Sequence, residues 1–183
     1  GVKGVFHLAA FKHVGMAEKL PHECTRTNVT GSLNILHETL PKKEIDFVIG
    51  ISTDKAAQVA GVYGATKLLM ERVFAQFEKI STSTKYRIVR YGNVLYSTGS
   101  VLCKWKELLQ SSQPVTVTDP NATRFFWTRE QAVDLIFQCL QEAKDSNPFV
   151  PDMKAMTIGD LLLAMHKKYS PDTPLKTNVI GLQ

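Results

Sequence analysis

The stretch that decides the fold is Ile51-Ser-Thr-Asp-Lys-Ala56, followed by Tyr63-Gly-Ala-Thr-Lys67. A short apolar run, Phe47-Val-Ile-Gly-Ile51, leads into it and is typical of a strand buried in a parallel sheet. Polar side chains begin at Ser52 and Thr53, where this strand would leave the sheet. Because open α/β sheets bind ligands at the carboxyl ends of their strands, the sequence predicts a site at this position.

Tyr63 and Lys67 lie four residues apart, which on a helix places them on one face, one turn from each other. A lysine cation held beside a phenol favours the phenolate and lowers the phenol pKa from its reference value of about 10. The pair therefore predicts a general base. The alternative is an ordinary helix on which a tyrosine and a lysine happen to be neighbours, and the Ser-Thr-Asp-Lys strand end before it favours the base.

Strands and helices alternate through the first half of the chain. Val2–Ala10 and Tyr86–Tyr91 have strand patterns, and helical patterns run from Pro21 to Leu40 and from Tyr63 to Phe77. This alternation predicts the α/β class, with a parallel, doubly wound sheet. Asn28 falls inside the first helical pattern, where the simplest interpretation is a helix-bending or satisfied polar residue.

The pattern changes after Asn93. One helix, a short strand at Pro114–Thr118 and two further helices follow, the last capped by Thr157 and Asp160. We therefore expect residues 1–94 to form a partial Rossmann-like dinucleotide-binding region with the catalytic motifs. Residues 95–183 are expected to form mostly a small mixed lobe that is not separable from the sheet.

The composition excludes several classes of protein. The chain has 183 residues, of which 44% are hydrophobic and 21% charged, which is ordinary for one soluble globular domain. No apolar run approaches the roughly 18 residues of a membrane span, and no signal peptide is recognisable, so a cytoplasmic location is expected. The three cysteines are far apart and lack metal-ligating spacing, which argues against a metal.

The net charge of +5 is scattered along the chain. No basic stripe with interleaved aromatic residues is present, so a nucleic-acid partner is not expected. A positive balance also suits a doubly charged sugar nucleotide. The glycine-rich turn that normally opens a dinucleotide-binding sheet is missing, because the 11 glycines are dispersed and no G-x-G-x-x-G occurs. The chain is therefore interpreted as beginning in the middle of a fold and as inactive by itself.

Taken together, these residues resemble the extended short-chain dehydrogenase/reductases, and within them the UDP-N-acetylglucosamine 4,6-dehydratases of the polysaccharide-biosynthesis family. The resemblance covers nearly the whole chain and implies the carboxyl-terminal two-thirds of an NAD(P)-binding Rossmann-like sheet with a small substrate-binding lobe. Its motifs are His7-Leu-Ala-Ala10, Lys12-His-Val14, Thr27-Asn-Val29, Ser52-Thr-Asp-Lys-Ala56, Tyr63-Gly-Ala-Thr-Lys67, Arg90-Tyr-Gly-Asn-Val94, Gly99-Ser-Val101, Thr118-Asp-Pro120, Thr123-Arg-Phe-Phe126 and Phe149-Val-Pro151.

The resemblance implies a catalytic role for five residues. Tyr63 would take the proton from the sugar 4-hydroxyl while hydride leaves C4 for a nicotinamide, and Lys67 would hold the nicotinamide ribose. Lys55 would remove the C5 proton if burial beside other cations leaves its amine neutral. Asp54 would protonate the departing 6-hydroxyl, and Thr53 would bind the sugar near C4.

Asp54 and Lys55 are adjacent, so side chains on a regular strand would point apart. Both can reach one sugar only where the strand gives way to a loop. The alternative for this pair is a surface ion pair.

The resemblance also implies the binding partners. The cofactor is expected to be NADP, with NAD as the alternative, the substrate a UDP-sugar, and the assembly a homo-oligomer without nucleic acid or membrane. Arg124 suits a pyrophosphate because its planar fork can donate two parallel hydrogen bonds. The implied substrate-binding residues are Asn93 and Arg124, and the implied cofactor-binding residues are Ala9, Ala10, Lys12, Asn28, Tyr63 and Lys67.

The chain departs from the family pattern at Tyr96 and Thr98, where a glycine and an arginine are usual. Two other functions remain open. A nucleotide-sugar 4-epimerase would use Tyr63 and Lys67 without needing Asp54 and Lys55. A catalytically silent module would only bind the sugar nucleotide.

Overall fold

The computed structural model describes residues 1–181, and the chain divides into two units. The first comprises Gly1–Tyr91 and Gln131–Pro151, and the second comprises Gly92–Glu130 and the residues from Asp152 onward. The sequence predicts one division near residue 94, and the structure differs in returning residues 131–151 to the first unit. The reason is that the helix in this segment buries its apolar side against the sheet.

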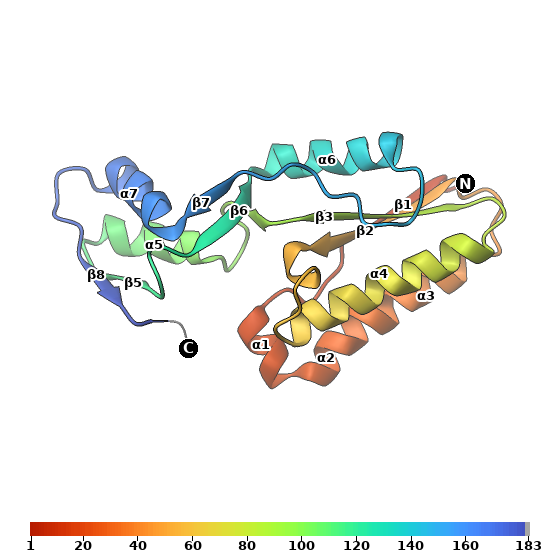
Figure 1. The fold of residues 1–183 in the computed structure, drawn as a ribbon, viewed down its shortest axis with the longest axis horizontal. Helices are drawn as coiled ribbons and strands as arrows, with labels where there is room; N and C mark the ends of the chain where they lie inside the picture. Colours follow the sequence, from red (N-terminus) through yellow and green to blue (C-terminus); the bar gives the residue numbers. More distant parts are fainter. Residues whose placement is uncertain (182–183) are drawn as a thin grey trace. The chain divides into compact units, whose positions relative to one another are not determined.

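Three parallel strands form the sheet of the first unit: β1 (Gly4–His7), β2 (Phe47–Thr53) and β3 (Lys85–Tyr91), in the order β1-β2-β3 (Figure 1). Both strand pairs are parallel and in continuous register, with Val5 opposite Val48 and Val48 opposite Tyr86. Strand β2 is mostly buried, as its unbroken apolar run predicts. The predicted α/β class with a parallel sheet is confirmed.

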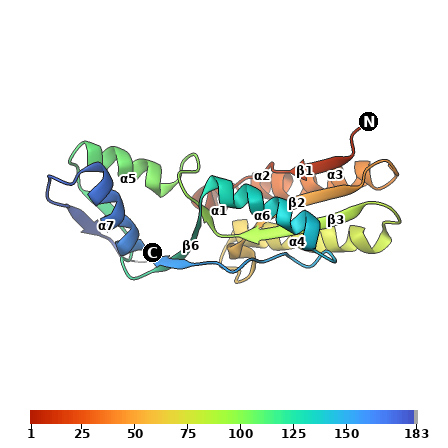
Figure 2. The ribbon, with the colours of Figure 1, turned by 90° about the horizontal axis from the view of Figure 1, so that it is seen from above.

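Helices cover both faces of this sheet, with α6 on one face and α3 and α4 on the other (Figures 1 and 2). The helical segments of the first unit are α1 (Val14–Lys19), α2 (Pro21–Thr25), a π-helical segment (Arg26–Thr30), α3 (Gly31–Thr39), α4 (Val62–Ile80) and α6 (Arg129–Glu142). The helix predicted from Pro21 to Leu40 is therefore present, with a π-helical segment around Asn28. The interpretation of Asn28 as a residue that perturbs the helix agrees with this geometry.

Apolar side chains fill the space on both faces of the sheet. On the side of α3 and α4, Leu36, Phe74 and Tyr86 are completely buried and pack with Val48 and Ile88. Burying a large apolar side chain contributes about 1.5–3 kcal/mol to folding. This core fixes α4 against β2 and β3, and α4 is the helix that carries Tyr63 and Lys67.

On the other face, Leu135 and Cys139 of α6 pack against Ile49 and Val89 of the sheet. This packing explains why the segment from 131 to 151 belongs with the first unit.

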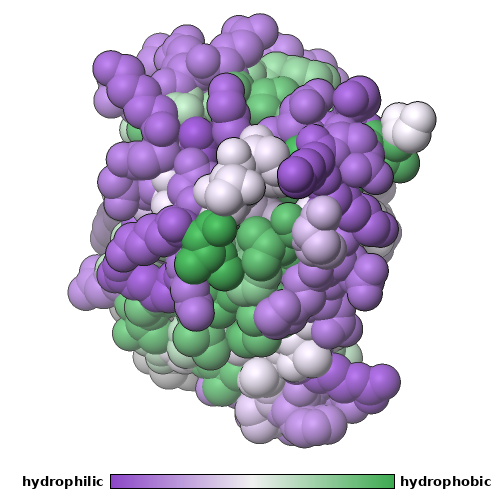
Figure 3. All heavy atoms as spheres, turned by 90° about the vertical axis from the view of Figure 1, so that its right-hand side faces the viewer, coloured by the Kyte–Doolittle hydropathy of each residue, from purple (hydrophilic) through white to green (hydrophobic). Residues whose placement is uncertain are grey.

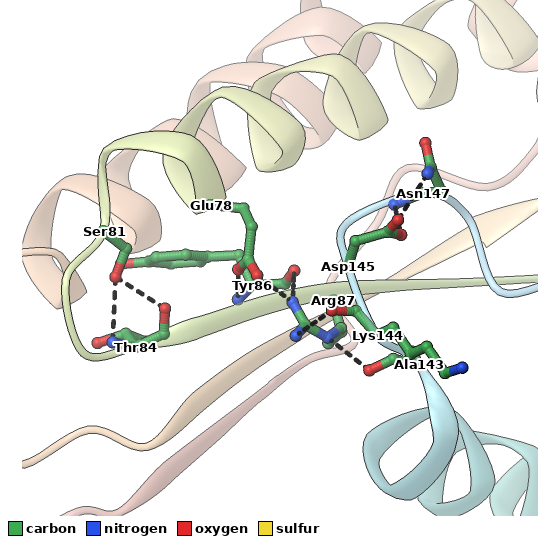
Figure 4. A network of polar contacts seen from close by, with 9 residues as sticks. All are labelled: Glu78, Ser81, Thr84, Tyr86, Arg87, Ala143, Lys144, Asp145 and Asn147. Atoms are coloured by element: carbon green, nitrogen blue, oxygen red, sulfur yellow. Dashed lines mark hydrogen bonds and ion pairs between the residues drawn. The ribbon is translucent and has the colours of Figure 1, made fainter.

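A buried arginine joins α6 to the sheet (Figure 4). The Arg87 side chain on β3 donates to the carbonyl oxygens of Ala143 at 3.1 Å and Lys144 at 3.3 Å, just past the end of α6. It also forms an ion pair of 2.5 Å with Glu78 of α4, whose second carboxylate oxygen accepts from the backbone N–H of Tyr86. Arg87 thus connects β3, α4 and the end of α6.

In its described part, up to residue 181, the second unit contains two small sheets and two helices. Its elements are β4 (Asn93–Val94), α5 (Val101–Gln110), β5 (Val115–Val117), β6 (Thr123–Trp127), β7 (Ala155–Thr157), α7 (Ile158–Tyr169) and β8 (Thr177–Val179). The strand orders are β4-β6-β7 and β5-β8. The predicted cap of the last helix is confirmed, because Thr157 Oγ1 accepts from the N–H of Asp160 at 3.0 Å.

The first unit has a mostly hydrophilic surface at its amino-terminal end. Figure 3 shows the end of this unit that carries the amino terminus, where hydrophilic side chains surround a small hydrophobic area. Within residues 1–181, none of the helices combines the length and the apolar character needed to cross a bilayer.

Candidate active site

The strand β2 ends in a short turn that brings polar side chains together. Asp54–Ala56 form a 3-10 turn directly after Thr53. Because the alternation of the strand stops there, the adjacent side chains converge: Lys55 Nζ lies 3.0 Å from Asp54 Oδ1, and Thr53 Oγ1 donates to the same oxygen at 2.9 Å. The expected convergence at the strand end is confirmed.

The partner of Lys55 in this cluster differs from the one that the resemblance implies. The resemblance implies a Lys55 amine kept neutral by neighbouring cations, whereas the Lys55 ammonium lies against the Asp54 carboxylate. The Asp54 side chain is 17% exposed and the Lys55 side chain 36% exposed, so the pair is partly open to water. Asp54 and Lys55 therefore form an ion pair, which is the alternative that the sequence left open. The pair lies at the carboxyl end of strand β2.

A glycine allows the next helix to lie directly on this turn. A Cβ atom added at Gly64, in the first turn of α4, would lie 2.4 Å from the backbone oxygen of Lys55. No real Cβ contact is that short, so the close approach requires glycine. It brings the neighbouring Tyr63 to the cluster, where the Tyr63 phenol hydrogen-bonds with Thr53.

The pKa of Tyr63 differs from the sequence prediction. The pKa is raised to about 12, because burial and the Asp54 charge raise it more than the hydrogen bond with Thr53 lowers it. The prediction that Lys67 lowers this pKa is wrong for this state of the chain. The cause is the position of the Lys67 ammonium, which donates to the carbonyl oxygen of Ile51 at 2.8 Å.

Lys67 is a buried cation at the end of β2. Its side chain lies one helical turn after Tyr63, as the spacing predicts, and the residue is only 3% exposed. Burial lowers the pKa of Lys67 to about 8, while electrostatic interactions with Cys24 and Glu71 act in the opposite direction. Lys67 is therefore close to losing its proton near neutral pH.

The loop after β1 presents three of the predicted cofactor residues. Ala9, Ala10 and Lys12 are exposed there, at the carboxyl end of a strand adjacent to β2. Asn28 holds this loop: its Oδ1 accepts from the backbone N–H of Phe11 at 2.7 Å, and its Nδ2 donates to the Phe11 carbonyl at 3.0 Å. Asn28 is completely buried, so it contacts the loop from behind.

Sequence reasoning missed the connection between this loop and α4. Thr66 of α4 accepts from Asn28 Nδ2 at 3.0 Å and donates to the backbone oxygen of Tyr63 at 2.9 Å. Thr66 lies within the Tyr63-Gly-Ala-Thr-Lys67 motif, but its long-range partner 38 residues away leaves no local signal. The loop and the helix are therefore fixed to each other by one amide.

A buried histidine continues the same network. His7 Nε2 lies 2.8 Å from Ser32 Oγ, and Ser32 donates its hydroxyl proton to the backbone oxygen of Asn28 at 2.7 Å. Because that hydroxyl has only one proton, His7 must donate through Nε2. Burial lowers the pKa of His7, and the Lys67 charge lowers it further, so the imidazole is neutral at pH 7.

The two predicted substrate-binding residues lie on adjacent strands of the second unit. Asn93 on β4 pairs with Phe126 of β6, and Arg124 lies two residues earlier on β6. Arg124 is exposed, and its Nη1 donates to the carbonyl of Thr123 at 2.7 Å. The five predicted catalytic residues, in contrast, all belong to the first unit.

The loop that follows Asn93 has a strained residue. Tyr96 has φ of 55°, a left-handed conformation in which a glycine would be unstrained. This agrees with the glycine that is usual at this position of the resembled family. The Tyr96 hydroxyl lies 2.9 Å from that of Tyr169 on α7, which attaches the loop to that helix.

Among residues 1–181, no group of three or more His, Cys, Asp or Glu side chains is arranged to hold a metal ion.

Comparison with known proteins adds the following relatives. A family model described as polysaccharide biosynthesis protein matches residues 1–183. A UDP-N-acetylglucosamine 4,6-dehydratase (inverting) of Campylobacter jejuni is 35% identical over 164 residues, which cover 88% of this chain and 49% of that protein. A UDP-glucose 4-epimerase of Rickettsia rickettsii is 33% identical over 178 residues, covering 96% of this chain and 52% of that protein.

A solved structure has the same fold. The X-ray structure of Pen from Bacillus thuringiensis matches with a TM-score of 0.91 at 34% identity, covering 99% of this chain and 57% of that chain. The chain spans about half the length of the curated relatives it matches.

Proposed function

Because the chain belongs to the polysaccharide biosynthesis family of extended short-chain dehydrogenase/reductases, we propose that it carries the catalytic residues of a nucleotide-sugar 4,6-dehydratase. The proposed substrate is UDP-N-acetylglucosamine or a close relative. The similarity to the Campylobacter jejuni dehydratase supports this choice. The reaction would be C4 oxidation, loss of water across C5 and C6, and reduction at C6.

The observation that carries the proposal is the Asp54–Lys55 contact beside Tyr63. Tyr63 and Lys67 account for reversible oxidation at C4, a step that epimerases share. Loss of water needs in addition a base for the C5 proton and an acid for the 6-hydroxyl. Asp54 and Lys55 provide a carboxyl and an amine 3.0 Å apart, and the Asp54 charge acts on Tyr63.

The ion pair can become an acid and a base by one proton transfer. A proton that moves from Lys55 Nζ to Asp54 Oδ1 leaves a neutral amine and a neutral carboxyl. Lys55 then takes the C5 proton, and Asp54 gives its proton to the 6-hydroxyl, which leaves as water. Both groups return to their starting charges. Thr53 would orient the sugar near C4, since its hydroxyl contacts both Asp54 and Tyr63.

A nicotinamide dinucleotide would supply the reversible hydride transfer at C4, with NADP proposed and NAD as the alternative. The residues present fit such a group, because Ala9 and Ala10 expose a small-residue loop at the carboxyl end of β1. Lys12 on the same loop, and Tyr63 with Lys67, are the proposed contacts. Asn28 would act through the loop that it holds from behind. Asn93 and Arg124 are the proposed contacts for the sugar nucleotide.

The test uses the full-length protein with UDP-N-acetylglucosamine in deuterated water. Loss of one water together with one deuterium gained at C5 supports the dehydratase, and Lys55→Ala should abolish C5 exchange with solvent while C4 oxidation survives. The exposed Lys43→Ala is the matched control, with no expected effect. Full C5 exchange in the Lys55 variant would show that another group is the base.

A second candidate is a nucleotide-sugar 4-epimerase, which the similarity to the Rickettsia rickettsii epimerase favours. Its product would have unchanged mass and altered stereochemistry at C4, and Asp54→Asn would leave the rate intact. A catalytically silent module would bind UDP in a titration without binding the dinucleotide. These outcomes separate the three functions.

A further inference from the structure

The face of α4 that carries Tyr63 and Lys67 continues to a buried carboxylate. Glu71 lies four residues after Lys67, and Lys67 lies four after Tyr63, so the three side chains follow one helical face. Glu71 is only 4% exposed. A carboxylate this deeply buried needs partners that compensate for its lost hydration.

Two strands provide those partners. Ser52 Oγ of β2 donates to Glu71 Oε1 at 2.5 Å. Arg90 of β3 donates through Nε to the same oxygen at 3.0 Å, and its Nη2 lies 2.5 Å from Oε2. Both carboxylate oxygens are therefore held by a planar, bidentate fork, which fixes the orientation of the Glu71 side chain.

These contacts are adjacent to the anchoring point of Lys67. The Lys67 ammonium donates to the carbonyl of Ile51, and Glu71 accepts from Ser52, the next residue of the same strand. Arg90 is the residue of β3 directly opposite Ser52. Two successive turns of α4 are thus attached to two successive residues of β2, which sets how far the helix lies along the strand.

Stability alone does not account for this arrangement. A buried ion pair loses the hydration of both charges, and apolar side chains of similar volume often give equal or greater stability. We propose that Glu71, held by Arg90 and Ser52, is a positioning residue that fixes the Lys67 ammonium at the end of β2 and keeps it charged. This inference rests on the proposed function only for the role of Lys67 in catalysis.

The charges around Lys67 agree with this role. Burial lowers the pKa of Lys67, and Cys24 of α2 and Glu71 of its own helix act in the opposite direction. The Lys67 charge in turn lowers the pKa of His7 on β1. His7 is neutral, and Glu71 holds a carboxylate one helical turn away that opposes the effect of burial. Removing the Glu71 charge should let the ammonium lose its proton more readily.

The test measures the pKa of Lys67 by NMR in the full-length protein labelled with ¹³C and ¹⁵N lysine, with the Lys67 signal assigned through Lys67→Met. In Glu71→Gln, the Lys67 pKa should fall by about one pH unit, since charges one helical turn apart interact strongly when buried. Dispersion of the amide spectrum reports whether the variant folds.

A second variant covers the case in which Glu71→Gln leaves Arg90 unpaired and unfolds the protein. In the double variant Glu71→Gln/Arg90→Gln, the two amides can hydrogen-bond with each other, and the Lys67 pKa should again be lower, by less than in Glu71→Gln because the Arg90 cation is removed as well. The matched control is Glu78→Gln/Arg87→Gln, which removes the other buried Arg–Glu pair between α4 and β3. This control should leave the Lys67 pKa unchanged.

An unchanged Lys67 pKa in the folded Glu71 variants would overturn the proposal, as would an equal shift in the control. Because the NMR titration needs no turnover, its outcome is independent of the dehydratase assay. A lowered pKa without water loss would refute the proposed function and leave the role of Glu71 standing.

Discussion

Lys67→Met is expected to make the protein more stable at neutral pH. The wild-type chain buries an ammonium whose pKa is lowered to about 8 from a reference value of 10.5. Below pH 8 both the folded and the unfolded chain hold this proton, and the folded state bears the cost of the buried charge. Between pH 8 and 10.5 the unfolded chain binds a proton that the folded chain has released, so stability rises with pH.

The magnitude follows from the size of the shift. A difference of about 2.5 pH units corresponds to about 3 kcal/mol. Methionine has a similar volume and no charge, but it loses the hydrogen bond to the Ile51 carbonyl, worth about 1 kcal/mol. The variant should therefore be about 2 kcal/mol more stable than the wild type at pH 7. Near pH 10.5 the order should reverse, with the variant about 1 kcal/mol less stable.

The assay is urea unfolding followed by circular dichroism at a series of pH values, comparing the variant with the wild type at each pH. Taking this difference cancels the titration of other groups, including Tyr63, whose raised pKa makes stability fall between pH 10 and 12 in both proteins. Lys79→Met, an exposed position on the same helix, is the control and should show no crossover. A variant less stable than the wild type at pH 7 would refute the reasoning.

Two further substitutions test the contacts that hold the first unit together. Arg87→Met should lower the free energy of unfolding by about 3–5 kcal/mol, because it leaves Glu78 and the carbonyls after α6 without their buried partner. Urea unfolding measures this loss of stability. A loss below about 1 kcal/mol would contradict the prediction. Gly64→Ala should cost about 1–3 kcal/mol and reduce turnover, because its Cβ would meet the Lys55 carbonyl; an alanine variant with normal stability and turnover would show that the turn moves freely.

Local patterns in the sequence predicted the elements that position the site. The alternation of apolar runs and helical spacing predicted the parallel sheet, and the four-residue spacing placed Tyr63 and Lys67 on one face of α4. The polar residues after Ile51 predicted a cluster at a strand end, which Asp54 and Lys55 form. These features depend on neighbours in sequence, so their physics is visible in the chain.

Features that depend on distant partners could not be predicted in the same way. The contact of Asn28 with Thr66 spans 38 residues, and the return of α6 to the sheet depends on packing with strands far earlier in the chain. The destination of the Lys67 ammonium was missed for a related reason: a backbone carbonyl, which every residue carries, leaves no mark in the sequence. Spacing therefore predicted which side chains share a face but not which atoms they bind.

The raised pKa of Tyr63 has a consequence for the proposed base. A phenol with a pKa of about 12 is about five pH units from ionising at pH 7, which corresponds to about 7 kcal/mol. A unit positive charge brought to about 4 Å in a medium with an effective dielectric constant of about 20 returns about 4 kcal/mol of that difference. The hydrogen bond with Thr53 acts in the same direction. In the proposed reaction, a positive charge near Tyr63 would favour its phenolate, and the Lys67 ammonium can supply that charge only while it carries its proton. Because the pKa of Lys67 is about 8, its ammonium is close to losing its proton near neutral pH. The Glu71 carboxylate, one turn further along α4, favours the charged form and therefore matters to the proposed chemistry.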